Sequence, residues 1–323
     1  MNLRKRINKR GFFLIAEIGN NHYGDINLAK KMISAASKSG ADAVKLQYIN
    51  PEKFIHFSNK NKLNLLKKIS FSKNEMIKLY KFAKKRKIEL FASIFDHHEI
   101  NFFSKLQNLF KIASCDNDLS IYFELISKYK RPTFISTGLV GQANLRLIYN
   151  LIRKNWNKEF RKQNIAVMHC ISEYPCKKSN LNLNSIKKIP DEFIKGYSDH
   201  TTGVDACLYA FLLGAKVIEK HFTLNKKDKR LRDNLLSADP NDLKKLVNNL
   251  QLAKTCIGDE IKKLSKQEKL DFNSIRRSPA TDENIKKGEK INPKNLIFLR
   301  PRIKSKTKIS SKMKTNKKKF DYI

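Results

Sequence analysis

Eight short apolar runs, rich in β-branched residues, recur along the chain, and stretches with helical periodicity separate them. This alternation is typical of βα units, in which neighbouring strands run parallel and helices cover the sheet. Eight such units in about 250 residues match the size of a (β/α)₈ TIM barrel, an α/β fold. The strands are predicted to begin at residues 12, 43, 88, 109, 132, 165, 193 and 215, and the helices between them include 28–39, 73–85, 121–130, 142–153, 202–213 and 240–257.

A doubly wound parallel sheet is the main alternative fold. Such a sheet normally has fewer strands, and its first turn holds a glycine-rich phosphate loop of the form GxGxxG. Here the first strand is followed by GNNHYGD, which lacks that pattern. The barrel is therefore the preferred prediction.

The sequence predicts a cytoplasmic protein. No apolar run approaches the roughly 20 residues that a membrane helix needs. The basic N-terminus is followed by an apolar segment, 12–16, that Glu17 interrupts, whereas a signal peptide needs an apolar core of about 7–15 residues. Five cysteines without a CxxC pair argue against a disulfide framework and against a zinc ribbon.

The sequence divides into four segments. Residues 1–257 hold the predicted barrel, and residues 258–274 are polar and typical of a linker. Residues 275–303 are predicted to form a small module of short strands and turns. Residues 304–323 form a lysine-rich tail that is expected to be disordered.

The chain carries a formal net charge of +37, which is typical of proteins that bind nucleic acid. The lysines are spread from end to end, and no RNP, zinc-finger or helix-turn-helix pattern accompanies them. We therefore interpret the charge as a compositional drift towards Lys, Asn and Ile, and predict no nucleic-acid partner. A positive field would also attract an anionic substrate.

Polar residues gather at the C-terminal ends of the predicted strands, where barrel enzymes carry their catalytic groups. Lys45 and Gln47 are two residues apart and share one face of their strand. Lys111 lies in the apolar run FKIAS, where it needs either a ligand or a structural ion pair. Lysines and serines together suit a phosphate and a carboxylate. The polar strand-end residues are Glu17, Lys45, Gln47, Asp96, Lys111, Ser114, Ser136, Ser172, Tyr174, Ser198, His200, Glu219 and His221.

His200 and His221 end the seventh and eighth predicted strands, beside a loop that holds Asp228 and Asp233. Two imidazoles with open positions suit a divalent transition metal such as Mn²⁺, Fe²⁺ or Zn²⁺. Four other histidines lack such a pairing and are predicted to be surface or loop groups: His22, His56, His97 and His98.

These motifs resemble those of the sialic acid synthase family, which includes legionaminic and pseudaminic acid synthases. The opening AEIGNNHYGDINLAKKMISAASKSGADAVKLQ is long and specific, and FKIAS, FISTG, HCISEYP, YSDHT and EKHFT follow at matching intervals. RRSPATDENIKKGE followed by FLRP is similar to the start of the family's C-terminal antifreeze-like domain. The resemblance covers about residues 12–301.

The resemblance implies a barrel enzyme that condenses phosphoenolpyruvate with an amino-sugar aldehyde in a domain-swapped homodimer. It implies a divalent metal, Mn²⁺ first and Mg²⁺ or Co²⁺ as alternatives, on His200 and His221, with Glu17 as a further catalytic residue. It assigns phosphoenolpyruvate to Lys45, Lys111, Ser114, Ser136 and Ser198. It assigns the acceptor sugar to Gln47, Tyr174, Asp233 and Arg300, the last reaching into the partner's barrel.

The chain departs from the family pattern in three places, one of which is Ser172 of HCISEYP, where one subgroup has Asn. The third strand reads FASIFD where many members have STPFD, which puts Ile94 near the substrate. After Pro301 the lysine-rich tail replaces about half a domain. The antifreeze-like module is therefore expected to be truncated, with consequences for acceptor binding.

In the implied mechanism, carbon 3 of phosphoenolpyruvate attacks the aldehyde, water adds at carbon 2, and phosphate leaves by C–O cleavage. The rival activities are a Schiff-base aldolase using Lys45 or Lys111 and another aldol-type synthase that uses phosphoenolpyruvate. A catalytically impaired homologue and a nucleic-acid-binding module are the non-enzymatic alternatives.

Overall fold

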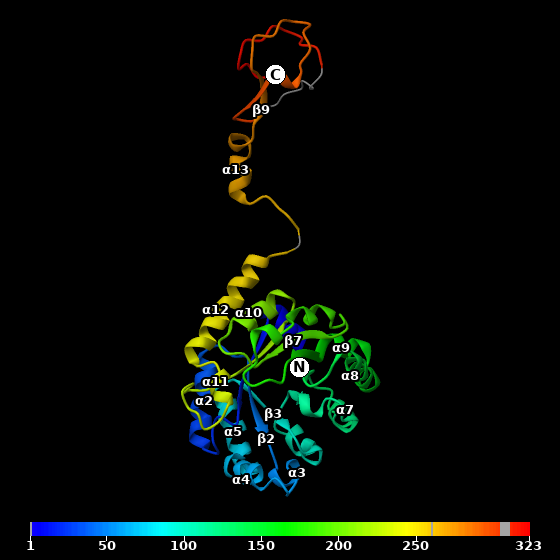
Figure 1. Cartoon of the computed structure of the whole chain (residues 1–323), viewed down its shortest axis with the longest axis vertical. Coiled ribbons are helices and arrows are strands. Elements are labelled where there is room, and N and C mark those ends of the chain that lie inside the picture. Colours follow the sequence, from blue (N-terminus) through cyan, green and yellow to red (C-terminus); the bar gives the residue numbers. More distant parts are fainter. Residues whose placement is uncertain (1, 260, 304–310) are drawn as a thin grey trace. The chain divides into compact units, whose positions relative to one another are not determined.

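The computed structural model describes residues 2–259, 261–303 and 311–323. The chain forms two compact units, Met1–Ile257 and Gly258–Ile323, coloured blue to yellow and yellow to red in Figure 1. No helix in the described part of the chain combines the length and the apolar character that a membrane crossing requires.

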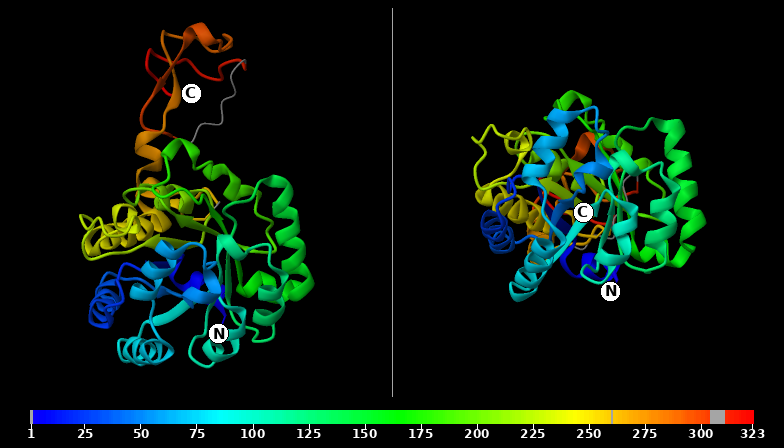
Figure 2. Two further views of the ribbon diagram at one scale, coloured as in Figure 1. Left: turned by 60° about the horizontal axis from the view of Figure 1, so that its bottom comes forward. Right: turned by 90° about the horizontal axis from the view of Figure 1, so that it is seen from below.

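The first unit is a closed barrel in which each strand pairs in parallel with the next and the eighth pairs with the first. Figure 2 shows helices around these strands. The TIM-barrel prediction and the eight predicted strands are confirmed. The strands are β1 (Phe13–Gly19), β2 (Ala43–Tyr48), β3 (Glu89–Ile94), β4 (Phe110–Ile112), β5 (Thr133–Ser136), β6 (Ile165–Cys170), β7 (Ile194–Asp199) and β8 (Val217–His221).

The helices of the first unit cover the outer faces of the strands, where a large apolar cluster joins the two layers. Side-chain caps fix several helix starts: Asp25 accepts hydrogen bonds from two backbone amides of α2, and Ser72 with Glu75 forms a capping box on α5. The helices are α1 (Leu3–Arg10), α2 (Ile26–Lys38), α3 (Pro51–Phe54), α4 (Lys60–Ile69), α5 (Lys73–Lys85), α6 (Ile100–Ser104), α7 (Ser120–Ser127), α8 (Gln142–Asn155), α9 (Lys158–Asn164), α10 (Asp205–Leu212), α11 (Asp233–Leu236) and α12 (Pro240–Ile257), with 3-10 helices η1 (His97–Glu99), η2 (Ser114–Asp116), η3 (Lys178–Asn180) and η4 (Leu183–Lys188).

The short helix α1 packs against the barrel interior from the N-terminal ends of the strands. Leu3 and Ile7, one helical turn apart, are buried in the same cluster as Phe13, Leu109 and the first residues of other strands. The sequence analysis did not predict α1, because LRKRINKR has only these two apolar residues among basic ones. Since α1 and this apolar cluster fill the N-terminal side, a polar site in the barrel belongs at the opposite end.

The second unit contains a small antiparallel sheet in which β9 (Ser278–Thr281) pairs with β10 (Leu296–Leu299), preceded on the chain by η5 (Pro293–Asn295). Before the sheet comes α13 (Lys266–Ile275), inside the segment predicted to be a linker. A capping box between Ser265 and Glu268 starts this helix.

Residues 311–323 are part of the second unit, so the predicted disorder of the tail is wrong for them; residues 304–310 lie outside the described part. Backbone bridges join Lys317 to Ile285 and Tyr322 to Ala280. Met313 and Ile323 are buried against Ile285. The lysine-rich composition misled the prediction, because the few apolar side chains of this segment are the ones that complete a small core.

Replacing Met313 with alanine is expected to destabilise the fold of the second unit. Removing a buried methionine side chain costs about 2–5 kcal/mol, a large fraction of the stability of so small a core. The amide protons of Ile285 and Lys317, which bond to each other's carbonyls at 2.8 Å, should then lose hydrogen-exchange protection. The exposed neighbour Lys314→Ala is the matched control. Unchanged protection in the Met313→Ala protein would contradict the role of this segment.

Candidate active site

A cavity of about 470 Å³ lies at the C-terminal ends of the barrel strands. All the site residues predicted within the barrel line it, and strands far apart in sequence contribute them. Arg300 lies in the second unit and is exposed. The predicted residues that line the cavity are Glu17, Lys45, Gln47, Lys111, Ser114, Ser136, Tyr174, Ser198, His200, His221 and Asp233.

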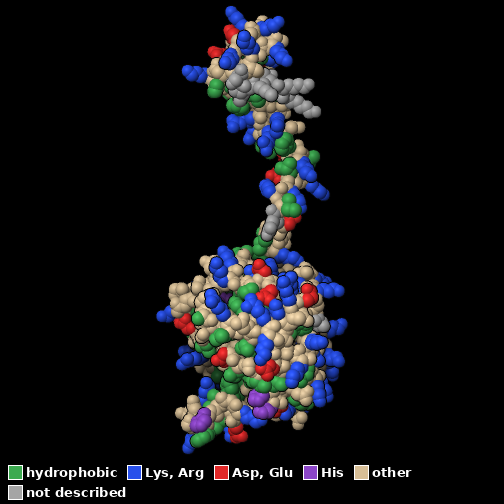
Figure 3. All heavy atoms as spheres, turned by 90° about the vertical axis from the view of Figure 1, so that its right-hand side faces the viewer, with side chains coloured by type: hydrophobic (Ala, Val, Ile, Leu, Met, Phe, Trp, Pro, Cys, Tyr) green, Lys and Arg blue, Asp and Glu red, His purple; other side chains and the backbone are tan. Residues whose placement is uncertain are grey.

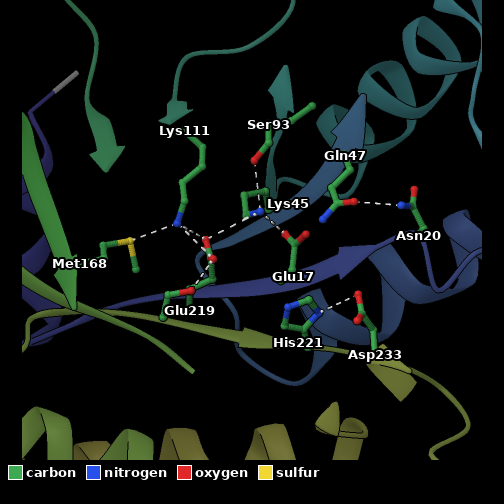
Figure 4. A network of polar contacts seen from close by, with 12 residues as sticks. Glu17, Asn20, Lys45, Gln47, Ser93, Lys111, Met168, Glu219, His221 and Asp233 are labelled. Atoms are coloured by element: carbon green, nitrogen blue, oxygen red, sulfur yellow. Dashed lines mark hydrogen bonds and ion pairs between the residues drawn. The ribbon is translucent and has the colours of Figure 1, made fainter. Parts of the chain in front are cut away.

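Two lysines and two glutamates meet in the cavity, as Figure 4 shows. Lys45 Nζ lies 2.7 Å from Glu17 Oε2 and 4.0 Å from Glu219 Oε2. Lys111 Nζ donates to both oxygens of Glu219 at 3.1 Å. Ser198 Oγ donates to the same carboxylate at 2.9 Å. The two lysines balance the charge of two ionised glutamates. All four side chains are buried, which shields the network from water.

The two glutamates of this network differ in their protonation. Burial raises the pKa of Glu17 to about 7, although Lys45 opposes the shift. Burial also favours the neutral form of Glu219, but Lys111 and Lys45 together outweigh it and lower the pKa to about 2. Glu17 can therefore exchange a proton near neutral pH, whereas Glu219 stays ionised.

Serine hydroxyls line the side of the cavity formed by β4, β5 and β6. Ser136 Oγ and Ser172 Oγ are buried and have no hydrogen-bond partner in the described structure. Ser114 Oγ accepts a hydrogen bond from the Gly138 amide at 3.1 Å and donates to Cys170 Sγ at 3.6 Å. Buried polar atoms without partners are costly, so these hydroxyls point to a polar ligand in the cavity.

His200 and His221 face each other across the cavity, with ring centroids 5.2 Å apart. His200 Nδ1 lies 2.8 Å from the Ile171 carbonyl oxygen, so it carries the proton and leaves Nε2 as a free lone pair. Among the described residues, buried His221 Nδ1 has no hydrogen-bond partner, and Asp233 Oδ2 lies 3.6 Å from it. Burial, with His200 nearby, lowers the pKa of His221 well below its usual value. Burial lowers the pKa of His200, but Cys170 and the Ile171 carbonyl outweigh burial and raise it. Two imidazoles beside a carboxylate fit a divalent metal ion, whose positive charge favours the deprotonated rings.

The decisive comparison is with protein families: residues 32–262 match the model of the NeuB family. The chain belongs to the NeuB family. Among its relatives, the N,N'-diacetyllegionaminic acid synthase of Campylobacter jejuni is 35% identical over 304 residues, which cover 89% of this chain and 90% of that protein. The N-acetylneuraminate-9-phosphate synthase of Mus musculus is 33% identical over 273 residues, covering 79% and 74%.

A solved structure of the same kind supports the family assignment. The N-acetylneuraminic acid (sialic acid) synthetase of Leptospira borgpetersenii, solved in complex with citrate, has a TM-score of 0.73 and 32% identity to this NeuB-family chain. The match covers 81% of this chain and 90% of that one. The named relatives are thus synthases of sialic-acid-type sugars.

Two contacts of this NeuB-family chain go beyond the sequence analysis. His22 lies in the turn after β1, within the predicted choice of surface or loop, but it is fully buried and stacks on Phe71 with ring centroids 4.0 Å apart. Lys111, for which the sequence left a ligand or an ion pair open, pairs with Glu219 at 3.1 Å. Neither contact was visible in the sequence, because each joins residues that are distant along the chain.

A second histidine cluster lies at the end of β3. One potential ligand atom from each of Asp96, His97 and His98 lies within 4.8 Å of the other two. In the described part of the chain, these three residues are close enough together to hold a metal ion. Asp96 is already engaged, since Lys53 Nζ lies 3.0 Å from Oδ2 and His98 Nδ1 lies 2.9 Å from Oδ1. His98 is exposed. The cluster is therefore a competing candidate for the metal.

The cavity also contains residues to which the sequence analysis gave no role. Ser93 Oγ accepts a hydrogen bond from Lys45 Nζ at 3.3 Å. Strand alternation in FASIF places Ser93 on the inner face, which was the available signal. Glu219 and Ser172 stood among the polar strand-end residues but had no assigned function, and Arg232 lines the cavity directly before the predicted Asp233.

Proposed function

We propose that this chain condenses phosphoenolpyruvate with an N-acetylated amino-sugar aldehyde, such as N-acetylmannosamine or a related hexosamine derivative, to give a nonulosonic acid and phosphate. One observation carries the proposal: a single cavity unites a buried lysine pair, unpartnered serine hydroxyls and two facing histidines. The activities printed in the names of the relatives agree with it.

The lysine and serine side of the cavity binds phosphoenolpyruvate in this proposal. Lys45 and Lys111 offset the negative charge of its phosphate and carboxylate, and Ser114, Ser136 and Ser198 donate to its oxygens. The ion pairs with Glu17 and Glu219 keep both ammonium groups in place before the substrate arrives. Burial in the barrel makes each of these interactions stronger than it would be in water.

His200 and His221 hold a divalent metal, for which Mn²⁺ is proposed and Mg²⁺ or Co²⁺ are alternatives. Such an ion polarises a carbonyl oxygen as a Lewis acid when it is bound. Two features support this assignment: the contact of His200 Nδ1 with the Ile171 carbonyl leaves the lone pair on Nε2, and His221 Nδ1 has no hydrogen-bond partner in the described part of the chain. Asp233, near His221, would lie beside the acceptor.

The reaction joins carbon 3 of phosphoenolpyruvate to the aldehyde carbon of the acceptor. The aldehyde oxygen gains a proton and becomes a hydroxyl, and carbon 2 becomes electron-deficient. Glu17, ionised, takes a proton from a water molecule as its oxygen bonds to carbon 2. The bond between carbon 2 and the bridging oxygen then breaks, inorganic phosphate leaves with that oxygen, and the new hydroxyl on carbon 2 loses its proton to become the keto group. The two protons of the water thus end on the hydroxyl formed from the aldehyde oxygen and on phosphate.

Gln47, Tyr174 and Asp233 orient the acceptor in this proposal, because all three line the cavity and Asp233 lies 3.6 Å from His221. Tyr174 packs on His200 with ring centroids 4.1 Å apart.

We further infer that the second unit is an antifreeze-like module, that the protein is a cytoplasmic two-fold dimer, and that Arg300 completes the partner's site. Mixing Arg300→Ala and His221→Ala chains should restore about a quarter of wild-type sites if this is so.

A Schiff-base aldolase is the second candidate, because burial lowers the pKa of Lys111. The contact of Lys111 with both oxygens of Glu219 favours the charged ammonium, which cannot attack a carbonyl. Borohydride reduction in the presence of pyruvate would trap a lysine adduct in an aldolase and none in the proposed synthase.

A nucleic-acid partner gains no support from the face in Figure 3, where Lys and Arg are spread among other side chains.

A phosphate-release assay with phosphoenolpyruvate and a panel of amino sugars tests the proposal. Phosphate should appear only when both substrates are present, and the preferred sugar names the acceptor. Release without a sugar, or none with any aldehyde of the panel, would contradict the proposed condensation.

The rate of turnover is expected to follow the ionisation of Glu17. Because its pKa lies at about 7, kcat should rise roughly tenfold per pH unit below pH 7 and level off above it. Glu17→Gln should lower kcat by about 10²–10⁴-fold and remove this inflection. A pH–rate profile of both proteins checks this. An inflection that persists in Glu17→Gln would assign it to another group.

A further inference from the structure

The outer face of β7 and β8 carries a charged pair at its C-terminal end. Asp199 and Lys220 are direct cross-strand neighbours, and Lys220 Nζ lies 2.6 Å from Asp199 Oδ2. Both side chains are fully buried, with 0% exposure. The outer face of a barrel strand normally packs apolar residues against helices, so an ion pair here calls for an explanation.

Strand alternation relates this pair to the active site. The preceding cross-strand pair, Ser198 and Glu219, faces the cavity and is hydrogen-bonded. Asp199 and Lys220 therefore face the opposite way. The next residue on each strand is His200 and His221, respectively. The buried ion pair thus joins the two strands immediately before the two histidines.

The contacts of Asp199 also hold the chain on the far side of His200. Asp199 accepts hydrogen bonds from the Thr201 amide at 3.0 Å and from Thr201 Oγ1 at 3.1 Å. Tyr197 Oη donates to it at 2.8 Å, and Lys220 Nζ also donates to the Thr201 carbonyl. The residues before and after His200 are thereby fixed through one carboxylate.

Stability alone does not account for such a pair. Replacing a buried ion pair with apolar side chains of similar volume is often neutral or stabilising, because the charges no longer lose their hydration. What apolar side chains cannot supply is a directional link between two defined atoms. A directional link at this place sets how the ends of β7 and β8 lie relative to each other.

We propose that Asp199 and Lys220 are a positioning pair that holds His200 and His221 at the separation and orientation needed to bind the metal. This inference rests on the proposed function, which makes the two histidines the metal ligands. Groups that orient metal ligands typically contribute about 10–100-fold to metal affinity.

The test measures metal binding directly, in the absence of substrates. Metal-free full-length protein is titrated with Co²⁺ and followed by visible absorption, with His97→Asn and His98→Asn present throughout to remove the competing cluster. The Asp199→Leu/Lys220→Met double variant should bind Co²⁺ about tenfold or more weakly, with altered d–d bands. Its melting temperature should fall, because the donors of Tyr197 and Thr201 lose their acceptor, so binding is compared well below that temperature. Excess metal should restore part of its turnover.

A second, partly buried ion pair on the same barrel provides the control. Arg161 and Glu192 contact each other at 2.5 Å with side chains 10% and 17% exposed, and Glu192 precedes the N-terminal end of β7. The Arg161→Met/Glu192→Leu variant should change the melting temperature and leave Co²⁺ affinity and spectrum as in the wild type.

Wild-type Co²⁺ affinity and spectrum in the Asp199→Leu/Lys220→Met protein would overturn the positioning role. If that protein does not fold, the Thr201→Val variant is measured instead. This variant removes one hydrogen-bond donor from Asp199 and keeps the ion pair with Lys220. Weaker Co²⁺ binding by Thr201→Val supports the proposal, and unchanged binding overturns it. A wild-type protein that binds no Co²⁺ overturns it as well. Co²⁺ binding without phosphate release contradicts only the proposed reaction.

Discussion

Replacing His221 with alanine is expected to lower kcat by about 10³-fold while the barrel stays folded. A Lewis acid contributes several kcal/mol to a developing charge, and ~4 kcal/mol corresponds to three orders of magnitude in rate. The fold should survive, because no hydrogen-bond partner of His221 Nδ1 would be left unpaired among the residues that the structure describes. Phosphate release should likewise stop in EDTA and return on addition of Mn²⁺.

The cluster of Asp96, His97 and His98 provides the control for this prediction. The His97→Asn/His98→Asn double variant removes both imidazoles of the competing metal candidate. It should keep wild-type turnover and the same dependence on added Mn²⁺. Full activity of His221→Ala in chelator, or loss of metal dependence in the His97→Asn/His98→Asn protein, would move the metal away from His200 and His221.

Replacing Lys111 with methionine is expected to raise the KM for phosphoenolpyruvate by about 10²-fold, or ~3 kcal/mol, since a buried charged donor is lost. The structure adds a second effect that the sequence did not reveal. Glu219 loses its closest cation and keeps only Ser198 at 2.9 Å and Lys45 at 4.0 Å. Breaking such a pair costs about 3–5 kcal/mol of stability at neutral pH.

The pH dependence of unfolding separates these two effects. In the wild type, Lys111 and Lys45 lower the pKa of Glu219 to about 2, so its stabilising contribution is complete above pH 4.5 and is lost as the pH falls through about 2. In the Lys111→Met protein the pKa of Glu219 rises, because the Lys111 charge no longer opposes the effect of burial. The stability difference between the two proteins should therefore shrink as the pH falls from 5 to 2.

The Lys111→Met/Glu219→Gln double variant completes the comparison, because it removes both charges of the pair. It should recover much of the stability at pH 7 without recovering phosphoenolpyruvate binding. Recovery of a wild-type KM in this double variant would show that Lys111 serves the fold alone.

The barrel could be predicted because its signal is periodic and local. Each strand is an apolar run, and each major helix has an amphipathic face, so eight strands could be placed before their pairing was known. The misses occurred where that signal is weak. Helix α1 has two apolar residues among basic ones, and residues 311–323 contribute only Met313 and Ile323 to a core.

The cavity residues could be predicted from strand ends, because all parallel strands of a barrel end on one rim. Their partners could not be predicted. The ion pair between Lys111 and Glu219 spans 108 residues of sequence, and only barrel closure brings the two together. The outward-facing Asp199 and Lys220 lie inside the motifs YSDHT and EKHFT, yet nothing in the sequence shows that they touch.

The central claim is that carbon 2 of phosphoenolpyruvate loses its bridging oxygen to phosphate as carbon 3 joins the sugar. Phosphoenolpyruvate labelled with ¹⁸O in the bridging position tests this directly when it is turned over with the preferred amino sugar. Mass spectrometry should find the label in inorganic phosphate and an unlabelled nonulosonic acid. Label retained in the sugar acid would mean cleavage of the P–O bond and would contradict the proposed reaction.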